Sequence, residues 1–185
     1  MVPITSLAIP ILLSAVLVFM ASSIIHMVLK YHQNDFSQVP NEDDVLEAFR
    51  RQHVTPGDYC APYAGSMKAM KSPAFLAKFK KGPVVTMTVS AGGEMHMGTQ
   101  FVLWFVYSAV ISLFAAYLTG RVLPAGAPYL DVFRVVGTVT FMGYAMALPP
   151  VSIWYKRSWG TTLRSMLDGL IYSLVTAGTF GWLWP

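Results

Sequence analysis

Residues 4–29 are ITSLAIPILLSAVLVFMASSIIHMVL, a run without a single Asp, Glu, Lys or Arg. An α-helix rises about 1.5 Å per residue, so about 20 apolar residues cross the hydrocarbon core of a bilayer. Three further apolar stretches of comparable length follow, at 99–118, 129–155 and 162–184. Hydrophobic residues make up 55% of the chain and charged residues only 12%. The sequence therefore predicts an all-α integral membrane protein with four transmembrane helices.

The one long polar segment, residues 30–98, lies between the first two predicted spans. Asn41 precedes three acidic residues, which is typical of a helix N-terminus. Ser72-Pro73 predicts the start of a second short helix. Cys60 is the only cysteine, so an intramolecular disulfide is excluded. A segment of this size usually needs a disulfide, a metal or a partner surface for stability.

Strand signals follow the second short helix. Residues 84–89 alternate and are rich in β-branched side chains, which predicts a strand. Gly92-Gly93 would turn that strand back through residues 94–97 as a short hairpin, and Pro56-Gly57-Asp58 predicts a separate turn. We therefore expect a small α/β insertion between the first and second transmembrane helices.

The distribution of Lys and Arg predicts the orientation. Residues 30–98 contain eight basic side chains and the third loop region contains three, whereas the second loop contains only Arg121. Basic loops collect on the cytoplasmic side of a membrane. We expect residues 30–98 in the cytoplasm, both termini outside, and a multi-pass protein of the bacterial inner (plasma) membrane. The net charge of +4 then reflects topology, and no nucleic-acid partner is expected.

Small side chains occur in three of the predicted spans, at four-residue spacing in the second and fourth, where they would let helix backbones approach closely. They are Ser108, Ser112 and Ala116 in the second span, Gly137 and Gly143 in the third, and Gly169, Ser173 and Gly181 in the fourth. Two interpretations are open: packing within the chain, or docking to other membrane subunits or to a second copy.

Ionisable side chains inside predicted spans are expected to need partners. Asp131 and Arg134 are three residues apart, and Arg164 and Asp168 are four apart, so each pair would share a helical face. The structural interpretation is two intrahelical ion pairs. The functional alternative is an ion or proton route that uses Arg134 and Asp168, with Thr138, Thr140 and Thr176 between them.

Metal ligation is the weaker hypothesis. His26 lies inside the first predicted span, and Met95-His96-Met97 resembles soft-ligand clusters that bind copper. Both His26 and His32 could meet His96 at the inner end of the bundle. We expect no bound cofactor, and no motif that would carry catalysis is visible.

Three segments resemble a family of small, uncharacterised bacterial inner-membrane proteins. They are Gly82-Pro83-Val84 leading to Met97-Gly98, Pro150–Trp154, and 168–172 running to 181–185. The resemblance implies the location but no activity. Our leading hypothesis is a non-catalytic accessory or assembly subunit of a larger membrane complex. The alternatives are a small oligomeric transporter or channel, and a metal or haem redox protein.

Overall fold

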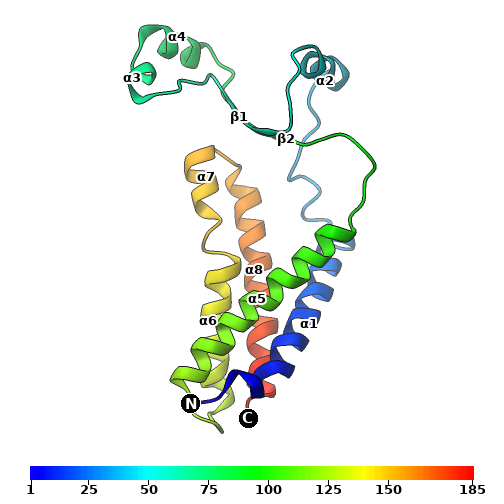
Figure 1. Cartoon of the computed structure of the whole chain (residues 1–185), viewed down its shortest axis with the longest axis vertical. Coiled ribbons are helices and arrows are strands. Elements are labelled where there is room, and N and C mark those ends of the chain that lie inside the picture. Colours follow the sequence, from blue (N-terminus) through cyan, green and yellow to red (C-terminus); the bar gives the residue numbers. More distant parts are fainter. The chain divides into compact units, whose positions relative to one another are not determined.

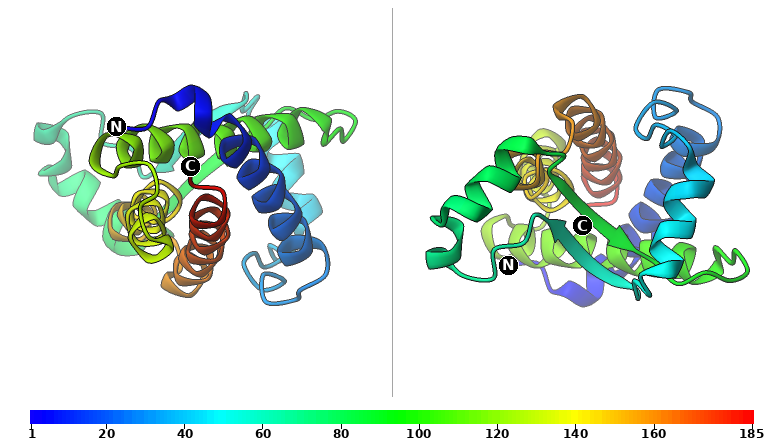
Figure 2. Two further views of the ribbon diagram at one scale, coloured as in Figure 1. Left: turned by 90° about the horizontal axis from the view of Figure 1, so that it is seen from below. Right: turned by 90° about the horizontal axis from the view of Figure 1, so that it is seen from above.

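The computed structural model describes all 185 residues and divides into two compact units. Unit 1 comprises Met1–Phe36 and His96–Pro185, and unit 2 comprises Ser37–Met95. Unit 1 is a helical bundle in which α8 lies against both α6 and α1, and α5 crosses α1 (Figures 1 and 2). Its elements are a 3-10 turn at Ile4–Leu7, α1 (Ala8–Met27), α5 (Gly98–Val122), α6 (Tyr129–Tyr144), α7 (Pro149–Tyr155) and α8 (Trp159–Trp182).

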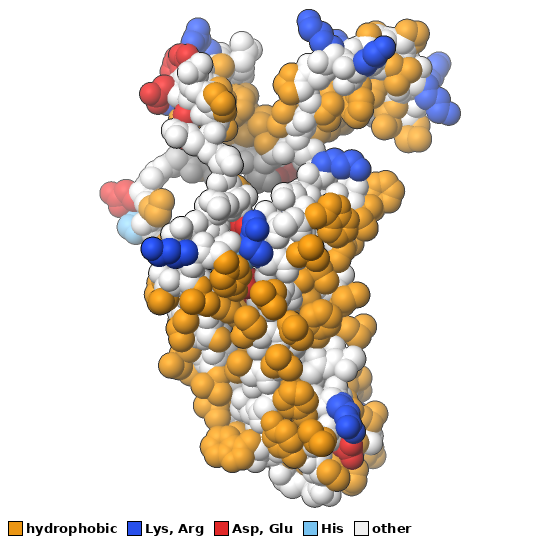
Figure 3. Space-filling model, turned by 180° about the vertical axis from the view of Figure 1, so that it is seen from behind, with side chains coloured by type: hydrophobic (Ala, Val, Ile, Leu, Met, Phe, Trp, Pro, Cys, Tyr) orange, Lys and Arg blue, Asp and Glu red, His pale blue; other side chains and the backbone are white.

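Three segments are long and apolar enough to cross a membrane. They are Ile4–Met27, Gly98–Val122 and Tyr129–Tyr155, with 24, 25 and 27 residues. Three of the four predicted spans therefore meet the criteria of length and composition. The fourth predicted span, 162–184, is also helical as α8, and its 24 residues are sufficient in length. Hydrophobic side chains cover most of the visible face of the bundle, and the charged ones lie towards its ends (Figure 3).

The third span is interrupted, although the sequence predicts one continuous helix over residues 129–155. Helix α6 ends at Tyr144 and α7 begins at Pro149. Pro149 and Pro150 have no N–H to donate, and a proline ring clashes with the carbonyl four residues earlier. The four residues Ala145–Leu148 therefore leave the helical path. A hydrogen bond of 2.6 Å between Ser152 Oγ and Thr162 Oγ1 joins α7 to α8.

The small residues of the predicted spans pack within the chain. Ser14 Oγ of α1 lies 3.0 Å from Ser112 Oγ of α5, where Ser108 and Ala116 are also fully buried. A Cβ added to Gly169 would come within 2.9 Å of the Cβ of Ala145, and one added to Gly181 within 2.7 Å of the Tyr129 ring. Added Cβ atoms at Gly137 and Gly143 would lie 3.4 Å from Ala177 and 3.3 Å from Ile111, and Ser173 is buried. The structure thus favours the internal interpretation of these faces.

Two hydrophobic clusters form the core of the bundle. The first joins α1, α5, α6 and α8 and includes Leu7, Ile11, Val136 and Phe180. The second contains Val18, Ile25, Ile111, Tyr144 and Tyr172, with Trp104 and Tyr31 packed against it. The second cluster matters for the site, because Tyr31 belongs to the segment that follows α1.

Unit 2 contains α2 (Glu42–Arg51), β1 (Gly57–Ala61), α3 (Met67–Met70), α4 (Pro73–Lys81) and β2 (Val85–Val89). Ser72 caps α4 by accepting a hydrogen bond from the Phe75 N–H at 3.2 Å. Asn41 precedes α2 as expected, but it adopts a left-handed conformation and its side chain makes no capping bond.

The strand pairing of unit 2 differs from the predicted hairpin. Strand β2 pairs antiparallel with β1, in the register Gly57 to Val89 and Ala61 to Val85, rather than with residues 94–97. Pro56-Gly57-Asp58 accordingly leads into a strand instead of forming only a turn. Thr88 Oγ1 donates a 2.5 Å hydrogen bond to Asp58 Oδ1 across this pair. The Gly92-Gly93 turn signal suggested a partner strand after β2, whereas the true partner, β1, precedes β2 in the chain.

Candidate functional site

The segment directly after α1 forms two tight turns that carry polar side chains onto the bundle. The N–H of Gln33 donates to the Lys30 carbonyl at 3.2 Å, and the N–H of Asp35 donates to the His32 carbonyl at 3.0 Å. The ring of Tyr31 packs against the second core cluster. This packing anchors the turns, so His32 and Asp35 are held at the end of the bundle.

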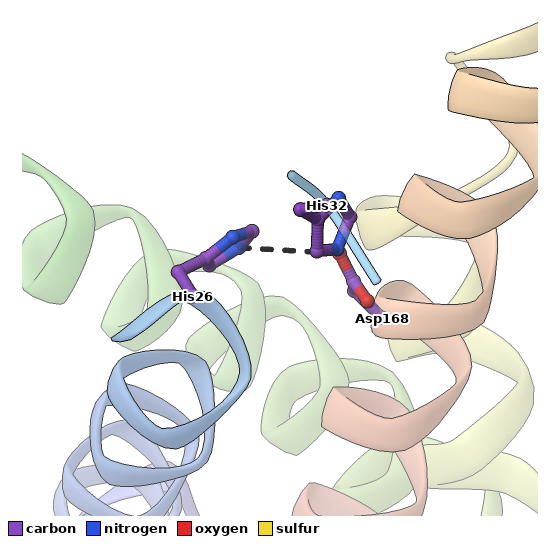
Figure 4. Close-up of side chains that lie close together, drawn as sticks. All are labelled: His26, His32 and Asp168. Carbon is purple, nitrogen blue, oxygen red and sulfur yellow. Dashed lines mark ion pairs between the residues drawn. The ribbon is translucent and has the colours of Figure 1, made fainter. Parts of the chain in front are cut away.

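Asp168 of α8 receives this segment. Asp168 is only 4% exposed, although its side chain is a carboxylate. The Tyr31 hydroxyl donates to Oδ1. Nε2 of His32 lies 2.9 Å from Oδ2, and Nε2 of His26, in the last turn of α1, lies 3.9 Å from the same oxygen. Figure 4 shows the two imidazole rings and the carboxylate gathered in this way.

A second carboxylate holds the other side of His32. His32 Nδ1 and Asp35 Oδ2 are 2.7 Å apart. Arg164 donates to Asp35 Oδ1 from Nε at 2.8 Å and from a terminal nitrogen at 2.5 Å. The cluster therefore runs from Arg164 through Asp35 and His32 to Asp168, and it connects the turns after α1 with two successive turns of α8.

This environment shifts two pKa values in opposite directions. Burial raises the pKa of the Tyr31 hydroxyl above its usual value of 10.0, and the neighbouring Asp168 raises it further. Burial also acts to raise the pKa of Asp35, but the hydrogen bonds and charges of His32 and Arg164 outweigh it, and the net shift is downward. Asp35 is thus held as a carboxylate, and Tyr31 is held as a hydrogen-bond donor.

The Arg164–Asp168 ion pair expected from the sequence is not the one that forms. Arg164 pairs with Asp35, and Asp168 is occupied by Tyr31 and the histidines. An arginine near a helix end can reach a separate segment as easily as its own next turn, and the buried Asp168 carboxylate accepts a hydrogen bond from Tyr31. The other expected pair is present, with Arg134 and Asp131 3.4 Å apart and their side chains 71% and 48% exposed.

The polar route considered between Arg134 and Asp168 is not assembled in this chain. Arg134 and Thr138 are exposed on the outside of α6, whereas Asp168 is buried. Thr140 and Thr176 are buried, but their hydroxyls donate to carbonyls of their own helices, at 2.8 and 2.9 Å. These residues form no continuous chain of polar side chains.

Comparison with known proteins supplies no assignment. No protein family model, curated protein or solved structure matches the chain. The resemblance to small bacterial inner-membrane proteins therefore stays a prediction.

Among the weak metal candidates, only His26 joins a group of ligating side chains. His26, His32 and Asp168 place one ligand atom each within 4.8 Å of the other two. His96 is not a member of this group, and Met95 is 90% exposed. Met97 lines a groove of about 540 Å³ together with His26, Trp104 and Phe101, between α1 and α5.

Sequence reasoning did not identify Tyr31 and Asp35 as site residues, and it expected His32 to meet His96 rather than Asp168. His26 and His32 are six residues apart, which would place them on different faces of a continuous helix. They meet because α1 ends at Met27 and the chain then turns. The useful signal was positional: the two histidines and Asp168 were all expected at the same end of the bundle.

Proposed function

We propose that the chain is a four-span protein of the bacterial inner membrane that serves as a non-catalytic accessory or assembly subunit of a larger membrane complex. In this proposal α8 is the fourth span, residues 30–98 are cytoplasmic and both termini lie outside. Unit 2 is the element that docks onto a partner subunit.

The outer face of α8 supports its role as a fourth span. Leu163, Leu167, Leu170 and Leu174 follow one another at helical spacing and are 41–58% exposed. The polar residues of α8 lie on the opposite, buried side, including Thr162, Thr176 and Asp168. A helix enclosed by its neighbours can carry such groups, since hydroxyls bond to the backbone of the same helix. These buried polar residues lower the mean hydropathy of α8 as a whole, although its outer face is apolar.

The number of spans determines where the C-terminus lies, because four spans place it on the same side as the N-terminus. A C-terminal alkaline phosphatase fusion should be active, and a green fluorescent protein fusion at the same position should be dark. The inverse result would mean three spans or the opposite orientation. A fusion after Arg157, in the loop between α7 and α8, provides the matched control and should give the opposite signals.

The observation that carries the docking role is the absence of a core in unit 2. No residue between Ser37 and Met95 is buried, although the segment contains capped helices and a paired strand. Leu46, Leu76 and Phe79 are 43–53% exposed. A unit this small that buries no apolar side chain within itself gains stability from another surface. In an accessory subunit, that surface belongs to a partner protein.

Isolation from native membranes tests the proposal. The chain, extracted in mild detergent after crosslinking, should bring down one or more partners in fixed stoichiometry. Substitution of both Leu76→Ser and Phe79→Ser should remove the partners. The matched control, Ala74→Ser with Ala77→Ser, changes two exposed positions of the same helix and should retain them. Recovery of only the monomer from wild-type membranes would contradict the proposal, as would a partner unaffected by the first pair of substitutions.

A further inference from the structure

We propose that His26, His32 and Asp168 bind one divalent first-row transition metal ion, of the Zn²⁺ class, at the end of the bundle where α1 meets α8. This inference goes beyond the docking role of unit 2, since all three residues belong to unit 1. The proposal rests on the position of the lone pairs, on the spacing of the ligand atoms, on the outer hydrogen bonds and on access from outside.

Two hydrogen-bond acceptors, His32 Nε2 and Asp168 Oδ2, face each other without a hydrogen bond between them. His32 Nδ1 is 2.7 Å from Asp35 Oδ2, so the proton of a neutral imidazole belongs on Nδ1 and the lone pair on Nε2. Nε2 lies 2.9 Å from Asp168 Oδ2, yet it is buried without an aligned hydrogen-bond partner. Two lone pairs at this distance repel one another unless a cation lies between them.

The charges agree with a bound cation. With both imidazoles neutral, the side chains of the cluster are two carboxylates, Asp35 and Asp168, and one guanidinium, Arg164. The net charge is then −1 in a largely buried environment. A divalent cation would change the net charge of the cluster from −1 to +1. It would lie beside Asp168, the carboxylate that does not pair with Arg164.

The spacing fits a transition metal with room for small adjustments. Metal–ligand bonds of about 2.0–2.2 Å in a tetrahedral or octahedral site place neighbouring ligand atoms about 3.0–3.5 Å apart. His32 Nε2 and Asp168 Oδ2 are 2.9 Å apart, and His26 Nε2 is 3.9 Å from the same oxygen. The side chain of His26 is 53% exposed, so its ring can rotate inward. Two imidazoles and one carboxylate suit Zn²⁺, Fe²⁺ or Co²⁺ better than Mg²⁺ or Ca²⁺.

The outer hydrogen bonds are those of a metal centre. A metal-bound histidine generally donates its other N–H to a carboxylate or carbonyl, which fixes the ring and its tautomer. Asp35 supplies this contact for His32, and Arg164 in turn fixes Asp35. Tyr31 donates to Oδ1 of Asp168, which leaves Oδ2 for the ion. Each side chain that holds a ligand is thus itself held.

The groove between α1 and α5 provides access. It has a volume of about 540 Å³ and is lined by His26, Met97 and Gln100, with aromatic side chains on its walls. An ion can reach His26 through this groove, and a water molecule can occupy a position that the three protein ligands leave open. The ion would tie α1 and the turns that follow it to α8.

Metal titration of the purified full-length chain tests the site. The protein carries a tag without histidines, is treated with a chelator, and is then titrated with Zn²⁺ in detergent by calorimetry. We expect one Zn²⁺ per chain and a higher midpoint of thermal unfolding when the ion is present. Co²⁺ should give the absorption bands of a nitrogen- and oxygen-coordinated ion, and Mg²⁺ should not compete.

Variants decide which residues bind. His26→Ala, at an exposed position that should not disturb folding, and His32→Ala should abolish stoichiometric binding, whereas Asp35→Asn should weaken it about 10–100-fold. His53→Asn, at an exposed histidine of unit 2, is the matched control and should bind like wild type. Absence of Zn²⁺ binding by the folded wild type would overturn the proposal. Undiminished binding by His26→Ala and His32→Ala would overturn it equally.

Discussion

Two pairs of charged residues, one on α6 and one on α8, have nearly the same spacing in sequence and different fates in the structure. Asp131 and Arg134 form the expected contact within α6, and both remain largely exposed. Arg164 and Asp168 instead find separate partners in the turns after α1, and Asp168 is buried. Local spacing therefore determines pairing only where no other segment competes for the same side chains. The buried cluster connects the turns after α1 to α8, whereas the exposed pair lies on α6 alone.

The largest difference should appear when each aspartate is removed. Asp168→Ala leaves the Tyr31 hydroxyl without its acceptor and removes the buried carboxylate beside the two imidazoles, and should reduce the free energy of unfolding by about 3 kcal/mol. Asp131→Ala removes an exposed pair and should cost less than about 0.5 kcal/mol. Titration with sodium dodecyl sulfate in mixed micelles, with a chelator present, measures both. Equal losses would show that the cluster contributes no more than a surface ion pair.

Gly169, the residue after Asp168, tests whether the cluster depends on close helix packing. It lies where α8 approaches the break that follows α6. Gly169→Ala places a Cβ 2.9 Å from that of Ala145 and 3.2 Å from the Tyr144 carbonyl carbon. It should destabilise the fold by about 1–3 kcal/mol through overpacking. Gly98→Ala meets nothing within 4 Å and should be neutral or stabilising. The same detergent titration separates the two, and a harmless Gly169→Ala would mean that the helices are not in contact there.

Removal of the Tyr31 hydroxyl should have an effect of similar size to that of Gly169→Ala. Tyr31→Phe keeps the ring in the core cluster and loses the hydrogen bond to a charged acceptor, which should cost about 1.5–3 kcal/mol. Tyr107→Phe loses a 3.0 Å hydrogen bond to the neutral Gly143 carbonyl at an exposed position. That loss should cost about 0.5–1 kcal/mol. If Tyr107→Phe is the more damaging change, Tyr31 does not anchor the turns on Asp168.

Helix positions were readable from the sequence, since apolar length and capping residues act locally. The starts of α1, α5 and α6 were expected within a few residues, and Ser72-Pro73 marked the start of α4. The interruption at Pro149 was not expected, because the apolar run continues on both sides of it. Proline chemistry alone would have predicted that break.

The site was less accessible to sequence reasoning, since it depends on where a turn carries side chains. Asp168 was expected to need a partner, and the i, i+4 rule supplied Arg164. The true partners come from residues 31–35, where Tyr31 is drawn into the core and carries His32 and Asp35 with it. The pairing of β2 with β1 was missed for the same reason, because long-range contacts leave no periodic signal.

The most direct test of the account is a double-mutant cycle on Arg164 and Asp35, measured by detergent-induced unfolding in the presence of a chelator. The variants are Arg164→Ala, Asp35→Asn and both together, and a parallel cycle with Arg134→Ala and Asp131→Asn is the control. We predict a coupling free energy of about 2 kcal/mol for Arg164 and Asp35, and at most about 0.5 kcal/mol for the exposed pair. No coupling between Arg164 and Asp35 would contradict the account, because the turns after α1 would then not be joined to α8 by this cluster.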